Sequence, residues 1–391
     1  MCGIAGIVES SGKPVSTQSI ETMCRALRHR GPDDEGVVDV GSKSTADRKA
    51  SAVLGNRRLS VIDVDGGHQP ISNEDGTVWT VLNGEIYNYR ELRKSLEEAG
   101  HYFTTSSDTE VIVHAYEMYA DKFVEYLDGM FAIAIWDTRR QQLLLARDRF
   151  GKKPLLYAQR DSWCAFASEL QALLVLPEIQ REIDPAAVGS YLSYMAVPAP
   201  QTIYRSIRKL PPAHVLIFKD GRASLRRYWQ LSFVPKQDLS DVEAAERSVE
   251  LLRDAVRKRL VSDVPIGALL SGGVDSTAVV SMMGRHHHKV RTFSIGFRDE
   301  PESNELAAAR ASSLIAASNQ IAIGLCARTR HCRSDASCSV ASHSESSLSV
   351  SAWPSTKTDV RARVTDTFMR RASRRKPIPE LGAEGRAGRA A

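Results

Sequence analysis

The sequence contains no uninterrupted run of 18 or more apolar residues, and we therefore expect no transmembrane helix and no membrane partner. Its first residues lack the basic and apolar regions of a secretory signal peptide, which favours a cytoplasmic location. The six cysteines form no CxxC pair and follow no zinc spacing, so no zinc site is indicated. A formal net charge of only +5 gives no reason of its own to expect a nucleic-acid partner.

What is present is typical of a globular protein with two domains. The chain has 391 residues, which is long enough for two sizeable hydrophobic cores. Hydrophobic residues make up 42% and charged residues 25%, both ordinary values. Function must therefore be sought in local motifs and not in bulk composition.

The first motif is the start of the chain, where Met1 precedes Cys2. Removal of Met1 would leave Cys2 with both a thiol and a free α-amino group, which pairs a nucleophile with a base on one residue. The apolar residues 4–8 predict a buried strand that would fix this nucleophile in place. The alternative is a cysteine at a frayed terminus.

Three further motifs place polar side chains next to predicted strands or helices. Arg58 stands at the mouth of an alternating strand and can form a bidentate pair with a carboxylate, although a solvent-facing arginine is the alternative. Asn83 and Gly84 follow the predicted strand 78–82 and offer two donors suited to an oxyanion, whereas Asn-Gly is also a common hairpin turn. Asp108 precedes a predicted helix, where it or its neighbour could simply be the N-cap.

A fifth motif lies in the second half of the chain. Residues 264–270 predict a buried strand, 271–276 (SGGVDS) a turn, and 277–284 a helix. A glycine-rich turn between strand and helix offers backbone N–H groups and a helix N-terminus to phosphates. It is not a Walker A loop, because the GK[ST] ending is absent. We therefore expect a phosphate-binding loop of another kind.

Taken in order, these motifs resemble the glutamine-hydrolysing asparagine synthetases of the bacterial B type. The resemblance is carried by Cys2 with GIAGI, RHRGPDDEG (28–36), RRLSVID (57–63), NGEIYNY (83–89), SSDTE (106–110) and RDRFGKKPLLY (147–157). It implies an α+β fold for the first half, an N-terminal nucleophile αββα sandwich of the class II glutamine amidotransferases. The SGGVDS turn resembles the pyrophosphate loop of ATP-pyrophosphatases, which implies an incomplete α/β, doubly wound parallel sheet for the second.

The resemblance also implies roles for individual residues. Cys2 would be the nucleophile and its own amine the base, with Asn83 and Gly84 forming the oxyanion hole. The remaining glutamine contacts would come from Arg58 to the α-carboxylate, Glu85 and Asp108 to the α-ammonium, and the backbone from Leu59 to Ile62. ATP would be bound by Leu270, Ser271, Gly272, Gly273, Asp275, Ser276 and Ile295, with Leu270 and Ile295 at the adenine. Mg²⁺ would be held mostly by ATP phosphates and Asp275, as a co-substrate complex, and no tightly bound cofactor is expected.

The resemblance ends after about residue 311. It divides the chain into an amidotransferase domain (2–182), a connecting segment (183–240), a partial synthetase domain (241–311) and a tail (312–391). The tail is rich in Ser, Ala and Arg without a period of 2 or 3.6, which predicts basic, disordered chain. Our hypothesis is a frameshift near residue 311, which resequencing of the gene would test. The alternative is a genuine basic tail that binds RNA or an anionic membrane.

The implied activity is ATP-dependent conversion of aspartate to asparagine, with glutamine as the nitrogen donor. Glutamate, AMP and pyrophosphate would be the other products. The alternatives are an amidotransferase for another carboxylate, such as relatives encoded near bacterial exosortase systems, and a glutaminase fragment with a defective synthetase domain. A non-enzymatic basic binding protein is a third alternative, which the Cys2 motifs disfavour. Members of this family often form dimers, so a homodimer is an option.

Overall fold

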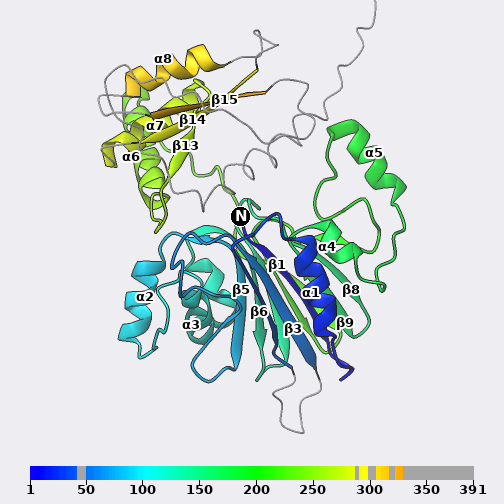
Figure 1. Ribbon diagram of the computed structural model, residues 1–391. Helices are drawn as coiled ribbons and strands as arrows, with labels where there is room; N and C mark the ends of the chain where they lie inside the picture. The colour runs from blue at the N-terminus through cyan, green and yellow to red at the C-terminus, as the bar shows by residue number, and fades with distance from the viewer. Residues whose placement is uncertain (42–49, 287–289, 298–304, 317–321, 329–391) are drawn as a thin grey trace, which may run out of the picture. The chain divides into compact units, whose positions relative to one another are not determined.

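The computed structural model describes residues 1–41, 50–286, 290–297, 305–316 and 322–328. Within these ranges the amidotransferase half is built on two six-stranded sheets, and the second half on a separate three-stranded sheet. Figure 1 shows the two larger sheets packed face to face, with helices on their outer faces. No helix in the described part of the chain is both long enough and apolar enough to cross a membrane.

The first sheet carries the N-terminal strand in its interior. Its order is β10-β8-β9-β1-β3-β2, and every neighbouring pair is antiparallel. All seven residues of β1 are buried, as the apolar run at 4–8 predicts. The strands are β1 (Gly3–Glu9), β2 (Asp34–Asp39), β3 (Ser51–Arg58), β8 (Leu156–Arg160), β9 (Trp163–Ala167) and β10 (Arg208–Lys209).

The second sheet has the order β12-β11-β7-β6-β5-β4 and is also antiparallel. Its strand β5 continues through the Asn-Gly pair, so the hairpin-turn alternative for Asn83 is wrong. The nine-residue pairing of β5 with β6 fixes which side chains reach the sheet edge. The strands are β4 (Ile71–Ser72), β5 (Val78–Ile86), β6 (Gly129–Asp137), β7 (Gln142–Arg147), β11 (His214–Lys219) and β12 (Arg222–Arg227).

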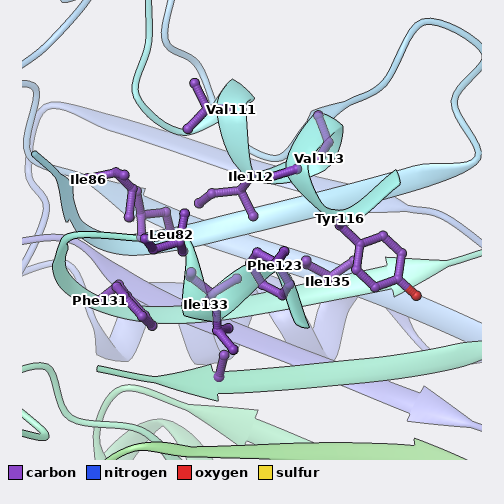
Figure 2. Close-up of a cluster of buried hydrophobic side chains, with 14 of the residues drawn as sticks. Leu82, Ile86, Val111, Ile112, Val113, Tyr116, Phe123, Phe131, Ile133 and Ile135 are labelled. Atoms are coloured by element: carbon purple, nitrogen blue, oxygen red, sulfur yellow. The ribbon is translucent and has the colours of Figure 1, made fainter. Parts of the chain in front are cut away.

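Three hydrophobic clusters hold the four layers together. One joins the facing sides of the two sheets, with members such as Ile4 and Trp136. A second lies between the first sheet and the helices α1 (Thr17–Ala26) and α4 (Leu170–Leu174). The third, drawn in Figure 2, joins the outer face of the second sheet to α2 (Tyr89–Glu98), α3 (Glu110–Tyr119) and the short helix η1 (Ala120–Glu125). The result is the αββα sandwich expected from the resemblance.

A charged network is buried beside α3. The His114 ring lies 3.1 Å from Glu117 through Nδ1 and 4.0 Å from Glu110 through Nε2. Burial favours the neutral ring, but the two carboxylates outweigh it and raise the pKa of His114 to about 9. Glu74, His101 and His114 also bring potential metal ligand atoms within 4.8 Å of one another. Because both ring nitrogens of His114 face carboxylates, we assign this group a structural role.

We expect His114→Gln to lower the free energy of unfolding by about 3 kcal/mol, because it leaves buried carboxylates without their cation. The His114 contribution is fully present below its ordinary pKa of 6.5 and is lost as the pH rises through about 9. The Glu110 contribution is present above 4.5 and is lost as the pH falls through about 2. Urea unfolding should therefore show the largest difference from wild type near pH 5.5. An equal difference at pH 9.5 would contradict this assignment.

The predicted connecting segment, residues 183–240, differs from what the structure contains. Its β10 pairs with β8, and its β11 pairs with β7, so both sheets of the sandwich continue into it. Only α5 (Pro185–Tyr194), which Asp184 caps at its N-terminus, stands apart from the strands. The Pro-rich composition of this segment indicated a linker, whereas its short strands are held by neighbours distant in sequence.

The three-stranded sheet has the parallel order β13-β14-β15 and follows the long helix that begins at a Ser240–Glu243 capping box. Helices α7 and α8 connect its consecutive strands, which is the pattern of a doubly wound fold. Its elements are α6 (Asp241–Lys258), β13 (Gly267–Leu269), α7 (Val274–His286), β14 (Arg291–Phe297), α8 (Leu306–Ala316) and β15 (Ala322–Arg328).

The start of the predicted tail also differs from the structure. Helix α8 crosses the expected boundary at residue 311, and β15 pairs with β14 along seven residues. The sequence period there is too weak to indicate a strand, because the strand is specified by its parallel partner and not by alternation. The rest of the predicted tail, residues 329–391, lies outside the described residues.

Candidate active site

The Cys2 thiol lies directly before β1, at the end of the first sheet where that strand begins. Its Sγ lies 3.4 Å from the backbone N–H of Leu59, which donates to it, and 3.7 Å from the Leu59 carbonyl oxygen. Burial raises the pKa of the thiol, while the Leu59 N–H acts in the opposite direction. A thiol in ordered contact with the backbone contradicts the frayed-terminus alternative for Cys2.

Arg30 and Ser168 anchor the strand that carries the thiol. The Arg30 Nε donates to the carbonyl oxygen of Cys2 at 2.8 Å, and its Nη1 pairs with Glu169 at 2.7 Å. Ser168 bonds both backbone groups of Ile4, with its hydroxyl accepting from the N–H and its own N–H donating to the carbonyl. No role for Arg30 was predicted from the sequence, although it lies within the RHRGPDDEG motif.

Asn83 and Gly84 lie near the C-terminal end of β5 in the second sheet, at the same end of the sandwich as Cys2. The Asn83 side chain is fully buried, and within the described structure neither its Nδ2 nor its Oδ1 has a hydrogen-bond partner. At Gly84 a Cβ would meet the Met130 carbonyl oxygen at 2.1 Å, so the close pairing with β6 admits only glycine. Burying an amide without a hydrogen-bond partner costs free energy. A ligand atom bound by Asn83 would supply the missing partner.

Arg58 is buried at the end of β3, which excludes the solvent-facing alternative. Its guanidinium donates to three backbone carbonyl oxygens, those of Ile62 (2.7 Å), Asp63 (2.6 Å) and Val64 (3.2 Å). These bonds hold the loop after β3 against the strand. Among the described residues no carboxylate pairs with Arg58, so its charge remains available to one from a ligand.

Glu85 and Asp108 form an acidic pair at the same end of the sheet. Asp108 accepts a hydrogen bond from the Ile86 N–H at 2.8 Å, so it does not cap α3; the hydroxyl of its neighbour Ser107 accepts instead from the Thr109 N–H at 3.1 Å. Burial raises the pKa of both carboxyl groups, and the Asp108 charge raises that of Glu85 further. In the described part of the chain neither forms an ion pair. A bound cation would relieve this repulsion.

One pocket of about 360 Å³ brings most of these groups together. Its lining includes Cys2, Leu59, Ile62, Gly84 and Glu85, which come from three separate strands and loops. Arg58 and Asp108 are hydrogen-bonded to the lining residues Ile62 and Ile86, and Asn83 directly precedes Gly84 in β5. Lys153 also lines the pocket and is buried, although nothing in the RDRFGKKPLLY motif singled it out.

The chain terminus lies in the same pocket. Met1 is part of its lining, although its side chain is largely exposed. Burial is the main cause that lowers the pKa of the Met1 α-amino group to about 6. Burial in this pocket therefore favours the neutral form of a terminal amine, which is able to accept a proton.

The SGGVDS motif forms a turn between β13 and α7. Gly272 has a φ of 85°, and a Cβ there would meet the backbone of Ala308 at 2.5 Å, so glycine is required on two grounds. The hydroxyls of Ser271 and Ser276 lie 3.0 Å apart across the turn. The turn leaves the start of α7 open, which is the arrangement suited to a phosphate.

The other predicted ATP residues surround this turn. Leu270 is buried and its N–H donates to the Phe293 carbonyl oxygen at 2.9 Å, which places it beside β14 and near Ile295. Asp275 is exposed in the first turn of α7, and no described His, Cys, Asp or Glu group with metal-ligand spacing includes it. Any metal at Asp275 would thus depend on ligands from a bound phosphate.

Comparisons with known proteins match the two halves of the chain to two different families. Residues 1–229 match the family model described as a glutamine amidotransferase domain, and residues 248–322 match the model described as asparagine synthase. Glutamine-hydrolyzing asparagine synthetase 1 of Bacillus subtilis (strain 168) is 38% identical over 304 residues, which cover 77% of this chain and 46% of the relative. Asparagine synthetase 2 of Oryza sativa subsp. japonica is 34% identical, over 77% of this chain and 46% of the relative.

The chain spans about half the length of these curated relatives. A solved structure of glutamine phosphoribosylpyrophosphate amidotransferase from B. subtilis, complexed with ADP and GMP, is similar with a TM-score of 0.42 and 19% identity, over 82% of this chain and 65% of that chain. Because the first family model covers more than half of the sequence, including Cys2, Asn83 and Glu85, the chain belongs to the glutamine amidotransferase domain family.

Proposed function

We propose that the Cys2 pocket hydrolyses glutamine to glutamate and ammonia. The observation that carries this proposal is the single pocket that joins a nucleophile, Cys2, to an acidic residue, Glu85, and to Gly84 beside the unpartnered amide of Asn83. A zwitterionic amino acid fits these charges, with its α-ammonium at the acidic pair and its α-carboxylate at Arg58. Sequence relatives named as glutamine-hydrolyzing support the same substrate.

The chemistry requires Met1 to be removed, so that the α-amine belongs to Cys2. This amine takes the thiol proton, and Sγ attacks the side-chain amide carbon of glutamine. The oxygen that becomes negative is stabilised by the Asn83 amide and the Gly84 N–H. The C–N bond then breaks as the amine returns the proton to the leaving nitrogen, which departs as ammonia. Water hydrolyses the thioester to glutamate and restores the thiol.

We further propose that the SGGVDS turn binds ATP, with Mg²⁺ as part of the substrate complex, to activate a carboxylate for amidation by this ammonia. The acceptor proposed is aspartate, in line with the match to the asparagine synthase model over residues 248–322. Gly272, Gly273 and the start of α7 would hold the phosphates, while Leu270 and Ile295 would border the adenine. An acceptor other than aspartate, or glutaminase activity alone, remains the alternative.

Two product assays separate these functions. Glutamate release from glutamine reports the Cys2 pocket alone, and we expect it without ATP. AMP formation from ATP, aspartate and added ammonia bypasses that pocket, and we expect AMP and asparagine in equal amounts. AMP with another carboxylate in place of aspartate would reassign the acceptor. Glutamate without any AMP would leave only the glutaminase proposal standing.

A further inference from the structure

The loop that follows β7 brings two adjacent lysines, Lys152 and Lys153, to the lining of the Cys2 pocket. Asp148 accepts hydrogen bonds from the backbone N–H groups of Phe150 (3.1 Å), Lys152 (2.9 Å) and Lys153 (3.0 Å). Arg147 donates to the carbonyl oxygens of Gly151 and Lys153, each at 2.8 Å. These bonds fix the backbone at Lys153 from both sides.

The two adjacent lysines of this loop have opposite environments. Both line the pocket that contains Cys2 and Glu85, but Lys152 is exposed, whereas Lys153 is only 5% exposed. Among the described residues no carboxylate lies within ion-pair distance of the Lys153 ammonium group. Burying a cation without a partner is expensive, so charges in the pocket itself must offset that cost.

Two groups in the pocket are suited to this. Burial lowers the pKa of Lys153, and the charges of Glu85 and Cys2 act against that change. In turn, Lys153 lowers the pKa values of both Glu85 and Cys2, in opposition to their burial. Lys153 therefore favours the ionised forms of Glu85 and Cys2, whereas the Glu85 charge by itself disfavours the Cys2 thiolate.

We propose that the Lys153 ammonium group is a positioning charge, which favours the thiolate form of Cys2 for attack and the carboxylate form of Glu85 for substrate binding. It needs no bond to the substrate, because it acts through these two groups. The proposal deepens the glutaminase function proposed above and rests on it for the role of the thiolate in turnover.

The test is the rate of alkylation of Cys2 by iodoacetamide as a function of pH, measured on the full chain after mass spectrometry has shown that Met1 is removed. Only the thiolate reacts, so the midpoint of the profile reports the thiol pKa. Lys153→Met keeps the side-chain length and removes the charge. We expect its profile to move to higher pH, with alkylation about tenfold slower at pH 7 for a shift of one unit.

Two further variants make the result specific. Lys153→Arg should return the profile to that of wild type, because it keeps the charge. Lys219→Met, at the exposed end of β11, removes a lysine far from the pocket lining and should leave the profile unchanged. If Lys153→Met does not fold, Lys153→Gln replaces it, with the same expectation. An unchanged midpoint in the neutral variant, or a shift that arginine does not reverse, would overturn the proposal.

The alkylation profile is independent of turnover. A shifted profile in a protein that releases no glutamate would support the charge coupling and refute the glutaminase function. Glutamate release together with an unshifted alkylation profile would support the glutaminase function and refute the charge coupling.

Discussion

Replacing Cys2 with alanine is expected to reduce glutamate release from glutamine by at least about 10⁴-fold, because no thioester can form without the thiol. Formation of AMP from ATP, aspartate and added ammonia should continue, since that reaction does not use the Cys2 pocket. The two measurements are a coupled glutamate assay and AMP quantification on the same preparation.

The matched control is Cys24→Ala. Burial raises the pKa of the Cys24 thiol to about 12, and its side chain is fully enclosed between α1 and the first sheet. We expect this variant to lose some stability but to keep its glutaminase rate. Wild-type glutamate release from Cys2→Ala would refute the assignment of the nucleophile.

Replacing Asn83 with leucine should lower kcat for glutamine hydrolysis by about 10²–10³-fold and change KM by less than tenfold, because the oxyanion appears only during the reaction. The melting temperature should not fall. In the described structure both polar atoms of the Asn83 side chain are buried without a partner, and an apolar side chain of similar volume removes that cost. The measurements are steady-state kinetics and thermal unfolding.

Asn56 on the neighbouring β3 provides the contrasting control. Its Nδ2 donates to Gln69 Oε1 at 3.1 Å and to the Leu82 carbonyl oxygen at 3.3 Å, so its amide is used by the fold. Asn56→Leu should therefore lose about 1–3 kcal/mol of stability and keep kcat in the folded protein. A loss of stability in Asn83→Leu, together with a loss of kcat alone in Asn56→Leu, would contradict both assignments.

The sequence predicted the elements around the pocket well where the local pattern is strong. The apolar run behind Cys2 is β1, and the predicted strand 78–82 lies within β5. Asn83 and Asp108 each had an ordinary structural alternative, a turn and a cap, and only long-range pairing decides against them. The pairing of β5 with β6 extends the strand through Asn83, and the Ile86 N–H donates a hydrogen bond to the Asp108 carboxylate.

Other features left no local signal in the sequence. Lys152 and Lys153 are identical in type and adjacent, and the N–H groups of both donate to Asp148, yet one side chain is exposed and the other buried. The strand β15 is defined by its pairing with β14 and not by its own alternation. The decisive partner of β15 is distant in sequence, which residue patterns do not encode.

The central place of β1 in its sheet has a consequence for synthesis of the chain on the ribosome. The strand that holds Cys2 is made first, yet its neighbours β3 and β9 are completed only at Arg58 and Ala167. The bond between Ile4 and Ser168 closes a loop of 164 residues. Contacts of such long sequence separation form late and slowly. The pocket around Cys2 therefore cannot be complete before Ala167 has been synthesised, so the proposed glutamine hydrolysis can begin only after that point.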